Sequence, residues 1–317
     1  MIKKKQTSLY LAPLEGITTF VYRNAMHRLF PDYIDKYYIP FIMPHIKRDM
    51  NMKERRELCY ENNKDLNAVP QLLTNSAQDF LRYEKIFSDM GYDEINLNLG
   101  CPSGTVTSKA RGAGFLAKKQ MLDEFFEEIF ADCNGKISVK TRIGVDCTEE
   151  FYELLEIYNK YPIYELTIHP RLLKEQYKGT PHREIFLYAL ENSKNKLVYN
   201  GDIWCSKDLK SLKDSLHMGE DDDLRLMIGR GAIADPAIFR ELNGGEALKK
   251  EELSWLLYEV ERGYFSFLSN ETQVLFRLKE MWTWLNRTVN GDKKYYKKLL
   301  KAKTLSEFRA IQDCLLV

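Results

Sequence analysis

Two amides and a thiol lie close together in one short apolar segment. Residues 95–102 read Ile-Asn-Leu-Asn-Leu-Gly-Cys-Pro, and a strand would place Asn96 and Asn98 on one face because side chains alternate along a strand. Two amides on a buried face need hydrogen-bond partners. Cys101 follows at the strand's end, and a thiol with an ordinary pKa of about 8.5 is protonated at neutral pH and can act as a general acid. The alternative is that Cys101 is a small apolar residue in a tight turn.

A lysine and a histidine end the next two apolar segments. Lys140 alternates with Ile137 and Val139, so we expect its side chain to point into the interior of the fold. A buried lysine needs an anionic or electron-rich partner to offset its lost hydration; the alternative is a lysine whose stem lies along the strand end with its amine in water. His169 has the same parity in its own segment, although a single histidine is more often structural.

Glycines follow the last two strand candidates. The sequences are Asn200-Gly201-Asp202 and Gly229-Arg230-Gly231. Glycine lets backbone N–H groups approach a phosphate closely, and the loops after the last two strands of a barrel often form a phosphate site. No G-x-G-x-x-G motif follows the first strand candidate, so we expect a phosphorylated cofactor rather than a dinucleotide.

Two further strand ends add groups to the same rim. The first strand candidate ends in Pro13, Leu14 and Glu15, and the third contains Gln71, whose amide can both donate and accept hydrogen bonds. A phosphate cradle, a buried lysine, amides and a thiol together suit flavin mononucleotide (FMN). Lys140 would then lie beside the electron-rich N1 and O2 atoms of the flavin ring.

The elements that must position these side chains alternate regularly between strand and helix. Eight strands in alternation with helices predict a (β/α)8 TIM barrel; an open doubly wound sheet is the rival, and eight units favour closure. The region 34–62 fits the alternation least well. The strand candidates are 8–14, 34–42, 68–73, 94–99, 136–141, 163–169, 196–200 and 224–228, and the helix candidates between them are 18–30, 77–90, 122–133, 149–161, 183–191, 207–216 and 236–242.

The chain changes character after the barrel. Four helix candidates follow, at 251–268, 273–289, 294–303 and 304–315, and no strand candidate remains. The pair Gly244-Gly245 suits a linker. We therefore predict a cofactor-binding barrel domain over residues 1–245 and a small helical domain over residues 246–317. Asp123, Thr148 and Ser206 are the predicted N-caps of three barrel helices.

Composition excludes several classes of protein. The 317 residues carry 47 Lys and Arg against 46 Asp and Glu, a net charge of +1 that excludes a uniformly basic nucleic-acid binder but not a local basic patch. No run of about 18 apolar residues could span a membrane, and residues 1–16 contain no apolar run typical of a secretion signal. The six cysteines form no C-x-x-C pair, which favours a reduced, cytoplasmic protein without structural zinc.

Six short motifs, in this order, resemble those of the tRNA-dihydrouridine synthase family: LAPLEG, NLNLGCPSGTV, KTRIG, IHPR, NGDI and IGRGA. Lys109 and the run RGAG at 111–114 add to the likeness. The resemblance covers the barrel from Leu11 to about Phe239, and the helical tail fits the family's second domain. It implies an FMN-dependent enzyme that reduces the C5–C6 bond of a uridine in tRNA and uses NADPH to reduce the flavin again.

The resemblance also implies roles for particular residues. Cys101 matches the proton donor, Asn98 matches the amide that contacts the target base, and Arg171 falls in the substrate site. Pro170 stands where the family often has glycine. The positions that match FMN-binding residues are Pro13, Leu14, Glu15, Gln71, Lys140, His169, Asn200, Gly201, Asp202, Gly229 and Arg230.

A basic run near the C-terminus is the candidate surface for RNA. Residues 293–303 contain six lysines and no acidic residue. Lys293, Lys294, Lys297 and Lys298 would contact the tRNA backbone without reading its sequence, and the target base would be flipped out to reach the flavin. The alternative is an ordinary solvated helix face.

Two other functions stay open at this stage. One is an FMN barrel similar to dihydroorotate dehydrogenase, which acts at the same bond of a free pyrimidine; the lysine run and the helical tail argue against a small substrate. The other is a noncatalytic tRNA-binding barrel, which would not need Cys101, Lys140 and both glycine loops together. We expect no metal, no membrane association and a monomer.

Overall fold

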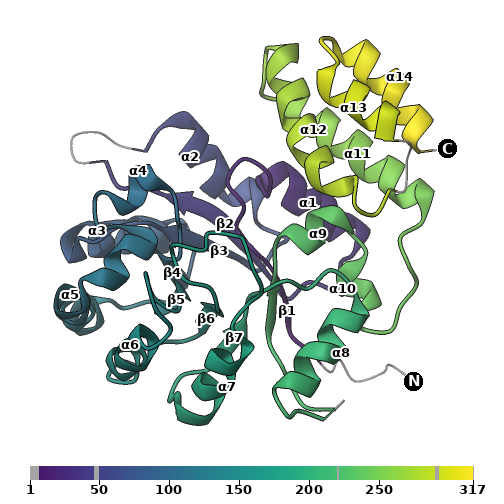
Figure 1. Cartoon of the computed structure of the whole chain (residues 1–317). Helices are drawn as coiled ribbons and strands as arrows, with labels where there is room; N and C mark the ends of the chain where they lie inside the picture. Colours follow the sequence, from purple (N-terminus) through teal and green to yellow (C-terminus); the bar gives the residue numbers. More distant parts are fainter. Residues whose placement is uncertain (1–6, 46–49, 220, 290–292, 317) are drawn as a thin grey trace.

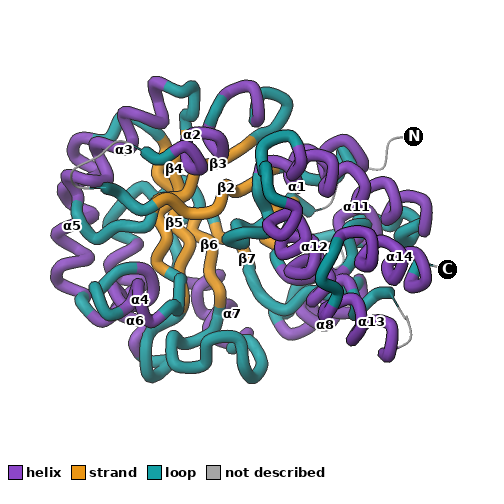
Figure 2. Tube along the Cα trace, turned by 90° about the horizontal axis from the view of Figure 1, so that it is seen from above, coloured by secondary structure: helices purple, strands orange, loops and turns teal. Residues whose placement is uncertain are grey.

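The structure is a computed structural model that describes residues 7–45, 50–219, 221–289 and 293–316. Its eight strands are parallel and close into a barrel in sequence order, with β8 paired to β1. Figure 2 shows the strands surrounded by helices. The predicted (β/α)8 barrel is therefore confirmed, and the open doubly wound sheet is excluded. The strands are β1 (Leu9–Leu11), β2 (Lys36–Ile42), β3 (Ala68–Leu72), β4 (Glu94–Leu99), β5 (Lys136–Arg142), β6 (Leu166–His169), β7 (Leu197–Tyr199) and β8 (Leu226–Ile228).

Both faces of the barrel strands are covered, which explains their nearly continuous apolar sequences. The outer faces pack on the helices in the main core of the protein. Inside the barrel, a second buried cluster is formed mainly by Tyr10, Tyr38, Val69, Val198 and Met227. The interior is thus a packed core rather than a pore, so ligands can enter only at the ends of the strands.

The helices of the barrel lie outside the strands (Figure 1). They follow the predicted positions, with α2, α4 and α9 as additional short helices between the predicted ones. Helices this short carry too few residues to show an apolar period. The barrel helices are α1 (Phe20–Leu29), α2 (Met52–Leu58), α3 (Ala77–Asp89), α4 (Gly104–Thr107), α5 (Lys119–Asp132), α6 (Glu150–Tyr158), α7 (Arg183–Asn192), α8 (Ser206–Ser215), α9 (Arg230–Ala234) and α10 (Ile238–Glu241).

The three predicted N-caps are wrong. Asp123 lies inside α5, because the polar first turn of that helix precedes the apolar pattern from which its start was predicted. Thr148 precedes the N-cap of α6 by one residue, and Ser206 is the first residue of α8. At α8 the N-cap is Cys205, and the carboxylate of Asp208 accepts hydrogen bonds from the backbone N–H groups of Trp204 and Cys205, at 2.8 and 3.1 Å.

Four helices follow the barrel, as predicted: α11 (Lys250–Phe265), α12 (Glu271–Leu285), α13 (Lys293–Lys301) and α14 (Leu305–Leu315). Helix α11 packs against α1, and α12 packs against α9, while α13 and α14 pack on α12 from the other side (Figure 1). A Cβ atom at Gly263 would lie 2.5 Å from Val21 Cγ1, so glycine lets α11 approach α1 closely. The helical part is therefore docked firmly beside the mouth of the barrel.

The predicted domain boundary falls in the segment 245–249, which has no regular secondary structure. The division into residues 1–245 and 246–317 stays a prediction. Residues 1–6 belong to the segment predicted to lack a secretion signal, and residues 46–49 belong to the region that fitted the alternation least well. Both lie outside the described residues. Around the second gap, β2 and α2 supply the strand and helix expected there.

Candidate active site

A cavity opens at the carboxyl ends of the strands, as expected for a barrel with a functional site. It includes every residue predicted to bind the cofactor except Glu15 and Gln71. Glu15 is exposed in the loop after β1, and Gln71 is fully buried within β3. The lining residues are Ala12, Pro13, Leu14, Gly100, Lys140, Arg142, His169, Tyr177, Asn200, Gly201, Asp202, Ile203, Trp204, Gly229, Arg230 and Gly231.

Lys140 points into this cavity from the end of β5. The pKa of its ammonium group is lowered to about 7, mainly by burial and then by the nearby Arg142, while Cys101 acts in the opposite direction. Within the described residues, no hydrogen bond or ion pair engages this group. An enclosed amine without a partner is costly to keep charged. Lys140 therefore has hydrogen-bonding capacity to spare at the cavity, and its role in binding an anionic or electron-rich ligand stays a prediction.

One carboxylate connects two arginines on the opposite side of the cavity. Arg171 donates to Asp202 Oδ2 at 2.6 Å, and Arg230 pairs with Asp202 Oδ1. Arg171 also donates to His169 Nε2 at 3.1 Å and to the carbonyl of Gly179 at 2.7 Å. The side chain of Arg171 has no exposed surface. In this arrangement it positions Asp202 and His169, and it does not present its guanidinium group to a macromolecule.

His169 is held in one neutral form. Burial lowers the pKa of the imidazole well below its ordinary value, and four neighbouring cationic side chains lower it further. Because Nε2 accepts a hydrogen bond from Arg171, Nδ1 carries the ring hydrogen. His169 can therefore donate one hydrogen bond without adding charge.

Aromatic rings enclose the guanidinium group of Arg230, a feature that was not predicted from the sequence. The group lies 5.0 Å from the ring centre of Tyr177, 5.5 Å from that of Trp204 and 5.7 Å from that of Trp284. Trp284 belongs to α12, and its ring stacks on Trp204 with centroids 6.4 Å apart. Arg287 lies 3.9 Å from the centre of the Trp204 ring. The helical region thus contributes side chains to the edge of the cavity.

The two glycine loops line the cavity, and their predicted role as a phosphate cradle stays a prediction. Asn200 donates from Nδ2 to the carbonyl of Met227 at 2.7 Å, which ties the end of β7 to β8. A Cβ atom at Gly201 would lie 2.3 Å from Tyr199 Oη, and one at Gly231 would lie 2.0 Å from the carbonyl oxygen of Ile203. A side chain at Gly231 would push its loop away from the backbone at Ile203, whereas one at Gly201 would collide with the buried Tyr199 ring.

Cys101 stands on the other side of the mouth, after β4. Gly100, the residue before Cys101, is held by Arg142, whose Nε donates to the Gly100 carbonyl at 2.9 Å. Gly112, with φ of +54°, passes so close that a Cβ there would lie 2.8 Å from the Cys101 carbonyl oxygen. Burial raises the pKa of the Cys101 thiol above its ordinary value. The sulfur atom is therefore protonated at neutral pH, as a general acid must be.

Asn98 and Gln71 meet below Cys101. Asn98 Nδ2 donates to Gln71 Oε1 at 2.7 Å, and Asn98 Oδ1 accepts from the backbone N–H groups of Gly100 and Cys101. Both side chains face the barrel interior, as the alternation along the strands predicted. Asn98 thus supports the turn that carries Cys101, in addition to any contact it makes with a ligand.

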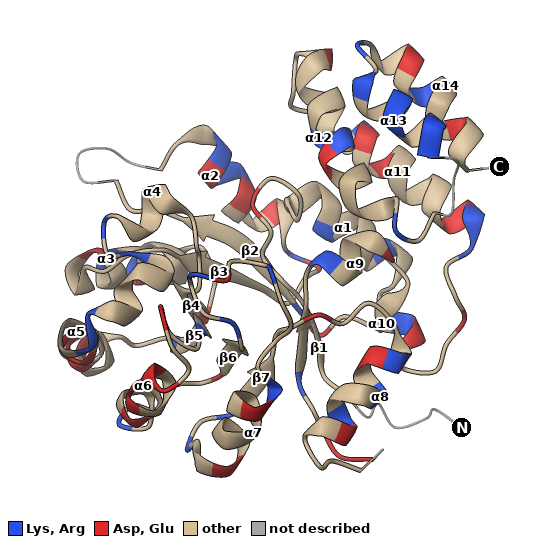
Figure 3. Ribbon diagram, in the orientation of Figure 1, with Lys and Arg blue, Asp and Glu red and all other residues tan. Residues whose placement is uncertain are grey.

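The predicted RNA-contacting lysines share one face of α13. Lys293, Lys294, Lys297 and Lys298 line a shallow hollow together with Lys301, and Figure 3 shows the concentration of basic residues on this helix. Tyr295 is exposed beside Lys298, whereas Tyr296 is partly buried and burial raises the pKa of its hydroxyl. Leu299 is fully buried and attaches the helix to its neighbours. A near-neutral chain therefore carries a strongly basic local surface.

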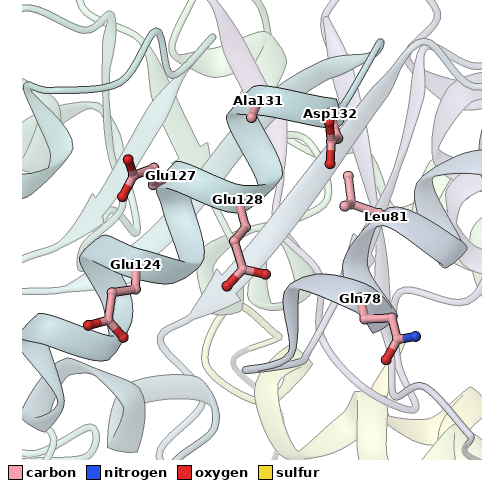
Figure 4. A pocket seen from close by; sticks show the side chains of 7 residues that line it. All are labelled: Gln78, Leu81, Glu124, Glu127, Glu128, Ala131 and Asp132. Atoms are coloured by element: carbon pink, nitrogen blue, oxygen red, sulfur yellow. The ribbon is translucent and has the colours of Figure 1, made fainter.

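A second hollow lies between α3 and α5, outside the barrel (Figure 4). Glu124, Glu127, Glu128 and Asp132 line it, so its charge is opposite to that of α13. In the described part of the chain, no three His, Cys, Asp or Glu side chains are arranged to hold a metal ion. None of the described helices is long and apolar enough to cross a membrane.

Arg142, Tyr177, Trp204 and Trp284 are site residues that the sequence analysis missed. Arg142 has the same parity as Lys140 along β5, so continuing the alternation by one step would have found it. The aromatic residues come from two loops and from α12, and no local pattern connects segments so far apart in the sequence.

The fold and the cavity define a (β/α)8 barrel with cationic side chains and glycine loops at its mouth. A family model described as dihydrouridine synthase matches residues 10–313. The chain belongs to the dihydrouridine synthase family.

Relatives of known name agree with this family. A "Probable tRNA-dihydrouridine synthase" of Staphylococcus aureus (strain Mu50) is 24% identical over 306 residues, covering 96% of this chain and 91% of that protein. A "tRNA-dihydrouridine synthase B" of Proteus vulgaris is 27% identical over 191 residues, covering 60% of this chain and 57% of that protein. Among solved structures, a dihydrodipicolinate synthase covers 99% of this chain and 100% of its own at 9% identity with a TM-score of 0.45, a likeness too weak to carry an argument.

Proposed function

We propose that this protein reduces the C5–C6 bond of a specific uridine in tRNA to 5,6-dihydrouridine, with FMN as cofactor and NADPH as reductant. The observation that carries the proposal is that two groups occur in the same barrel mouth. One is the amine of Lys140, which has no hydrogen-bond partner among the described residues, and the other is the protonated thiol of Cys101. Membership of the dihydrouridine synthase family supports the same reaction.

The residues around the cavity fit FMN. Lys140 supplies the positive charge that the electron-rich N1 and O2 side of a flavin ring needs. The glycine loops at Gly201 and Gly229 supply backbone N–H groups, and Arg230 adds a cation, for the phosphate. Pro13 and Leu14 offer an apolar wall from the β1 end. When bound, FMN would take a hydride from NADPH and pass a hydride to C6 of the uracil ring.

Cys101 completes the reduction by donating its thiol proton to C5. The raised pKa of this thiol keeps the proton in place until charge develops on the uracil. Uridine thus gains one hydride and one proton, and the resulting thiolate recovers its proton from solvent. The turn around Cys101 is held by Asn98 and Arg142, so the sulfur atom does not need to be positioned anew in each cycle.

The tRNA would lie across the mouth and the helical region. The lysines of α13 would hold phosphates without reading sequence, and the target uridine would swing out of the folded tRNA into the mouth. We assign cofactor binding to residues 1–245 and tRNA binding mainly to residues 246–317. Asn98 would contact the target base, and Arg171 would act from beneath by positioning Asp202 and His169 rather than by touching tRNA.

The two rival functions have weaker support. A barrel acting on a free pyrimidine would not need the lysine face of α13, and the family match favours a dihydrouridine synthase. A noncatalytic RNA-binding barrel would have no use for a protonated thiol and an unpartnered lysine in the same mouth.

A gene deletion combined with a cofactor assay tests the proposal. The purified protein should carry a yellow chromophore that is released as FMN and bleaches with NADPH under anaerobic conditions. Mass spectrometry of tRNA from the deletion strain should show one dihydrouridine position missing, and a plasmid copy should restore it. A colourless protein that takes up no flavin, or an unchanged dihydrouridine map, would overturn the proposal.

A further inference from the structure

A chain of buried amides runs across three strands beneath the Cys101 turn. Gln71 Nε2 donates to Asn96 Oδ1 at 2.7 Å, and Asn96 Nδ2 donates to Ser138 Oγ at 2.9 Å. These residues come from β3, β4 and β5, and the strand register places Gln71 beside Asn96 and Asn96 beside Ser138. None of the three side chains is exposed to solvent. These hydrogen-bonded side chains therefore belong to the barrel interior. Neither Asn96 nor Ser138 has a role in the function proposed above.

Asn98, at the upper end of this chain of amides, fixes the donor-to-acceptor direction of its hydrogen bonds. Asn98 Oδ1 accepts from the backbone N–H groups of Gly100 and Cys101 at 3.0 and 2.9 Å. Backbone N–H groups can only donate, so Asn98 must present its oxygen to them. Its nitrogen then faces Gln71 Oε1, at 2.7 Å. Each following amide is oriented in turn, with oxygen toward the donor above and nitrogen toward the acceptor below.

The lower end agrees with this direction. Ser138 accepts from Asn96 and keeps its own hydroxyl hydrogen for another partner. The carboxylate of Glu94 is close: burial raises the pKa of Glu94, while Lys36 and the Ser138 hydroxyl lower it. Lys36 bridges Glu94 and Glu165 at 2.7 Å each. The amide chain is therefore anchored at one end by the backbone N–H groups and ends at the other in the Ser138 hydroxyl, near the ionic cluster of Lys36, Glu94 and Glu165.

We propose that Asn96 and Ser138 are positioning residues that hold the amides of Gln71 and Asn98 in a single orientation and so keep the Cys101 turn rigid. A buried amide that loses its partner can rotate or drift, and the loss passes along the chain because each group orients the next. Asn96 connects the two halves of the chain, so its removal has the largest effect. Ser138 closes the chain, and its removal has a smaller effect.

The orientation has a chemical consequence, which rests on the proposed function. Asn98 Oδ1 already accepts two hydrogen bonds, while Asn98 Nδ2 donates one and retains a second hydrogen. The capacity that remains for ligands is therefore mainly that of a donor. Donors suit the carbonyl oxygens of uracil and of the flavin ring, and they do not suit the amino group of cytosine.

Two variants break the chain, and a third serves as a matched control. Asn96→Leu removes the acceptor of Gln71, and Ser138→Ala removes the acceptor of Asn96. Thr167→Val is the control, because Thr167 is an equally buried residue inside the barrel whose hydroxyl has no hydrogen-bond partner. The measurements are amide hydrogen exchange at Gly100 and Cys101, and the rate at which iodoacetamide alkylates Cys101, read from its peptide by mass spectrometry.

We expect exchange at these two amides to become about tenfold faster in Asn96→Leu, the effect of losing one hydrogen bond of ordinary net strength. Ser138→Ala should give a smaller increase, and alkylation of Cys101 should follow the same order. Thr167→Val should match the unaltered protein. Exchange in β7 should change in none of them, since a merely structural loss would speed exchange throughout the barrel.

Both readouts work on protein without flavin or tRNA, so they decide the role of the chain even if the proposed function fails. Unchanged exchange at Gly100 and Cys101 in the variants, or acceleration that is equal across the barrel, would overturn the positioning role. If Asn96→Leu does not fold, the positioning role is decided by comparing amide exchange at Gly100 and Cys101 in Ser138→Ala with that in Thr167→Val. Assays of dihydrouridine formation test the proposed function separately.

Discussion

The two sides of the barrel mouth differ in their use of charge. The side formed by β3 and β4 presents a thiol and amides, and the pKa of its thiol is raised by burial. The side formed by β6, β7 and β8 presents His169, Asp202 and two arginines, with Asp202 shared between Arg171 and Arg230. A proton donor needs a site that disfavours its anion, whereas a phosphate needs cations. In the proposed function the barrel would meet both needs, because separate strands carry the thiol and the cationic side chains.

Lys140 stands between the two sides. In the register of β4 and β5 it lies beside Asn98, and it is close enough to Cys101 and Arg142 for each to affect its pKa. The comparison therefore predicts different effects of substitutions on the two sides. A substitution of Cys101 should slow the chemical step and leave cofactor binding intact, whereas substitutions near Lys140 and Arg230 should first weaken cofactor binding.

The largest effect is expected from Cys101→Ala. The variant should keep FMN bound and NADPH oxidation intact, while dihydrouridine formation slows by about 10²–10⁴-fold, the usual contribution of a positioned acid. Single-turnover assays with unmodified tRNA measure this step directly. Full activity in the variant would remove the thiol from the reaction.

Lys140→Met should act on binding. Loss of a charge-assisted contact should weaken FMN binding about 10- to 100-fold, measured by fluorescence titration of the flavin-free protein. Cys101→Ala serves as the control and should bind FMN normally. Equal affinity in Lys140→Met would mean that Lys140 does not face the flavin.

The pKa of Lys140 gives this prediction a pH dependence. The flavin-free protein has a Lys140 pKa of about 7, and binding to the electron-rich ring would favour the charged form and raise it. Above pH 7 binding must therefore take up a proton, so affinity should fall by up to about tenfold per pH unit. Riboflavin, which has no phosphate to titrate, is the suitable ligand between pH 7.5 and 9. The slope should vanish in Lys140→Met, and a slope that persists would be due to another group.

Removal of the basic face of α13 should have an intermediate effect on tRNA alone. Replacing Lys293, Lys294, Lys297 and Lys298 with alanine should raise KM for tRNA about tenfold, since each exposed ion contact contributes up to about 1 kcal/mol, and should flatten its salt dependence. A matched control removes the same charge from exposed lysines of the barrel: Lys64, Lys85, Lys194 and Lys210. An unchanged salt slope in the α13 variant would count against this surface as the tRNA contact.

The smallest effect should come from Trp284→Ala. Loss of one cation–π contact to Arg230 should weaken FMN binding about two- to fivefold and leave riboflavin binding unchanged, because Arg230 serves the phosphate. Trp255→Ala is the control, because Trp255 belongs to α11 and lies beside Arg28 of α1, away from the cavity. Equal losses for FMN and riboflavin would show that Trp284 acts on the fold and not on the phosphate site.

The fold was predictable because its strands are short apolar segments that alternate regularly with amphipathic helices. All eight strands overlap their predicted ranges, and the interior positions of Asn96, Asn98 and Lys140 followed from the alternation of side chains alone. Helix starts were less predictable. At α8, for example, the N-cap is Cys205 rather than Ser206, and the carboxylate of Asp208 in the first turn accepts from the N–H group of Cys205.

The site was predictable only where it is made by strand ends. The bridge from Arg171 through Asp202 to Arg230, and the stack of Trp204 on Trp284, join segments that are 28 to 80 residues apart. Such contacts depend on how the loops and α12 close over the cavity, which no local pattern records. The resemblance named Arg171 as a substrate residue, but it could not reveal that the side chain is buried under the carboxylate that it supports.

The most direct test of the account is a single turnover under anaerobic conditions. The flavin of the purified protein is reduced with one equivalent of NADPH, and tRNA lacking dihydrouridine is then added. We predict that the flavin absorbance returns and that one dihydrouridine forms per flavin reoxidised, while Cys101→Ala leaves the flavin largely reduced on the same time scale. Rapid reoxidation without dihydrouridine, or equal product from Cys101→Ala, would contradict the account.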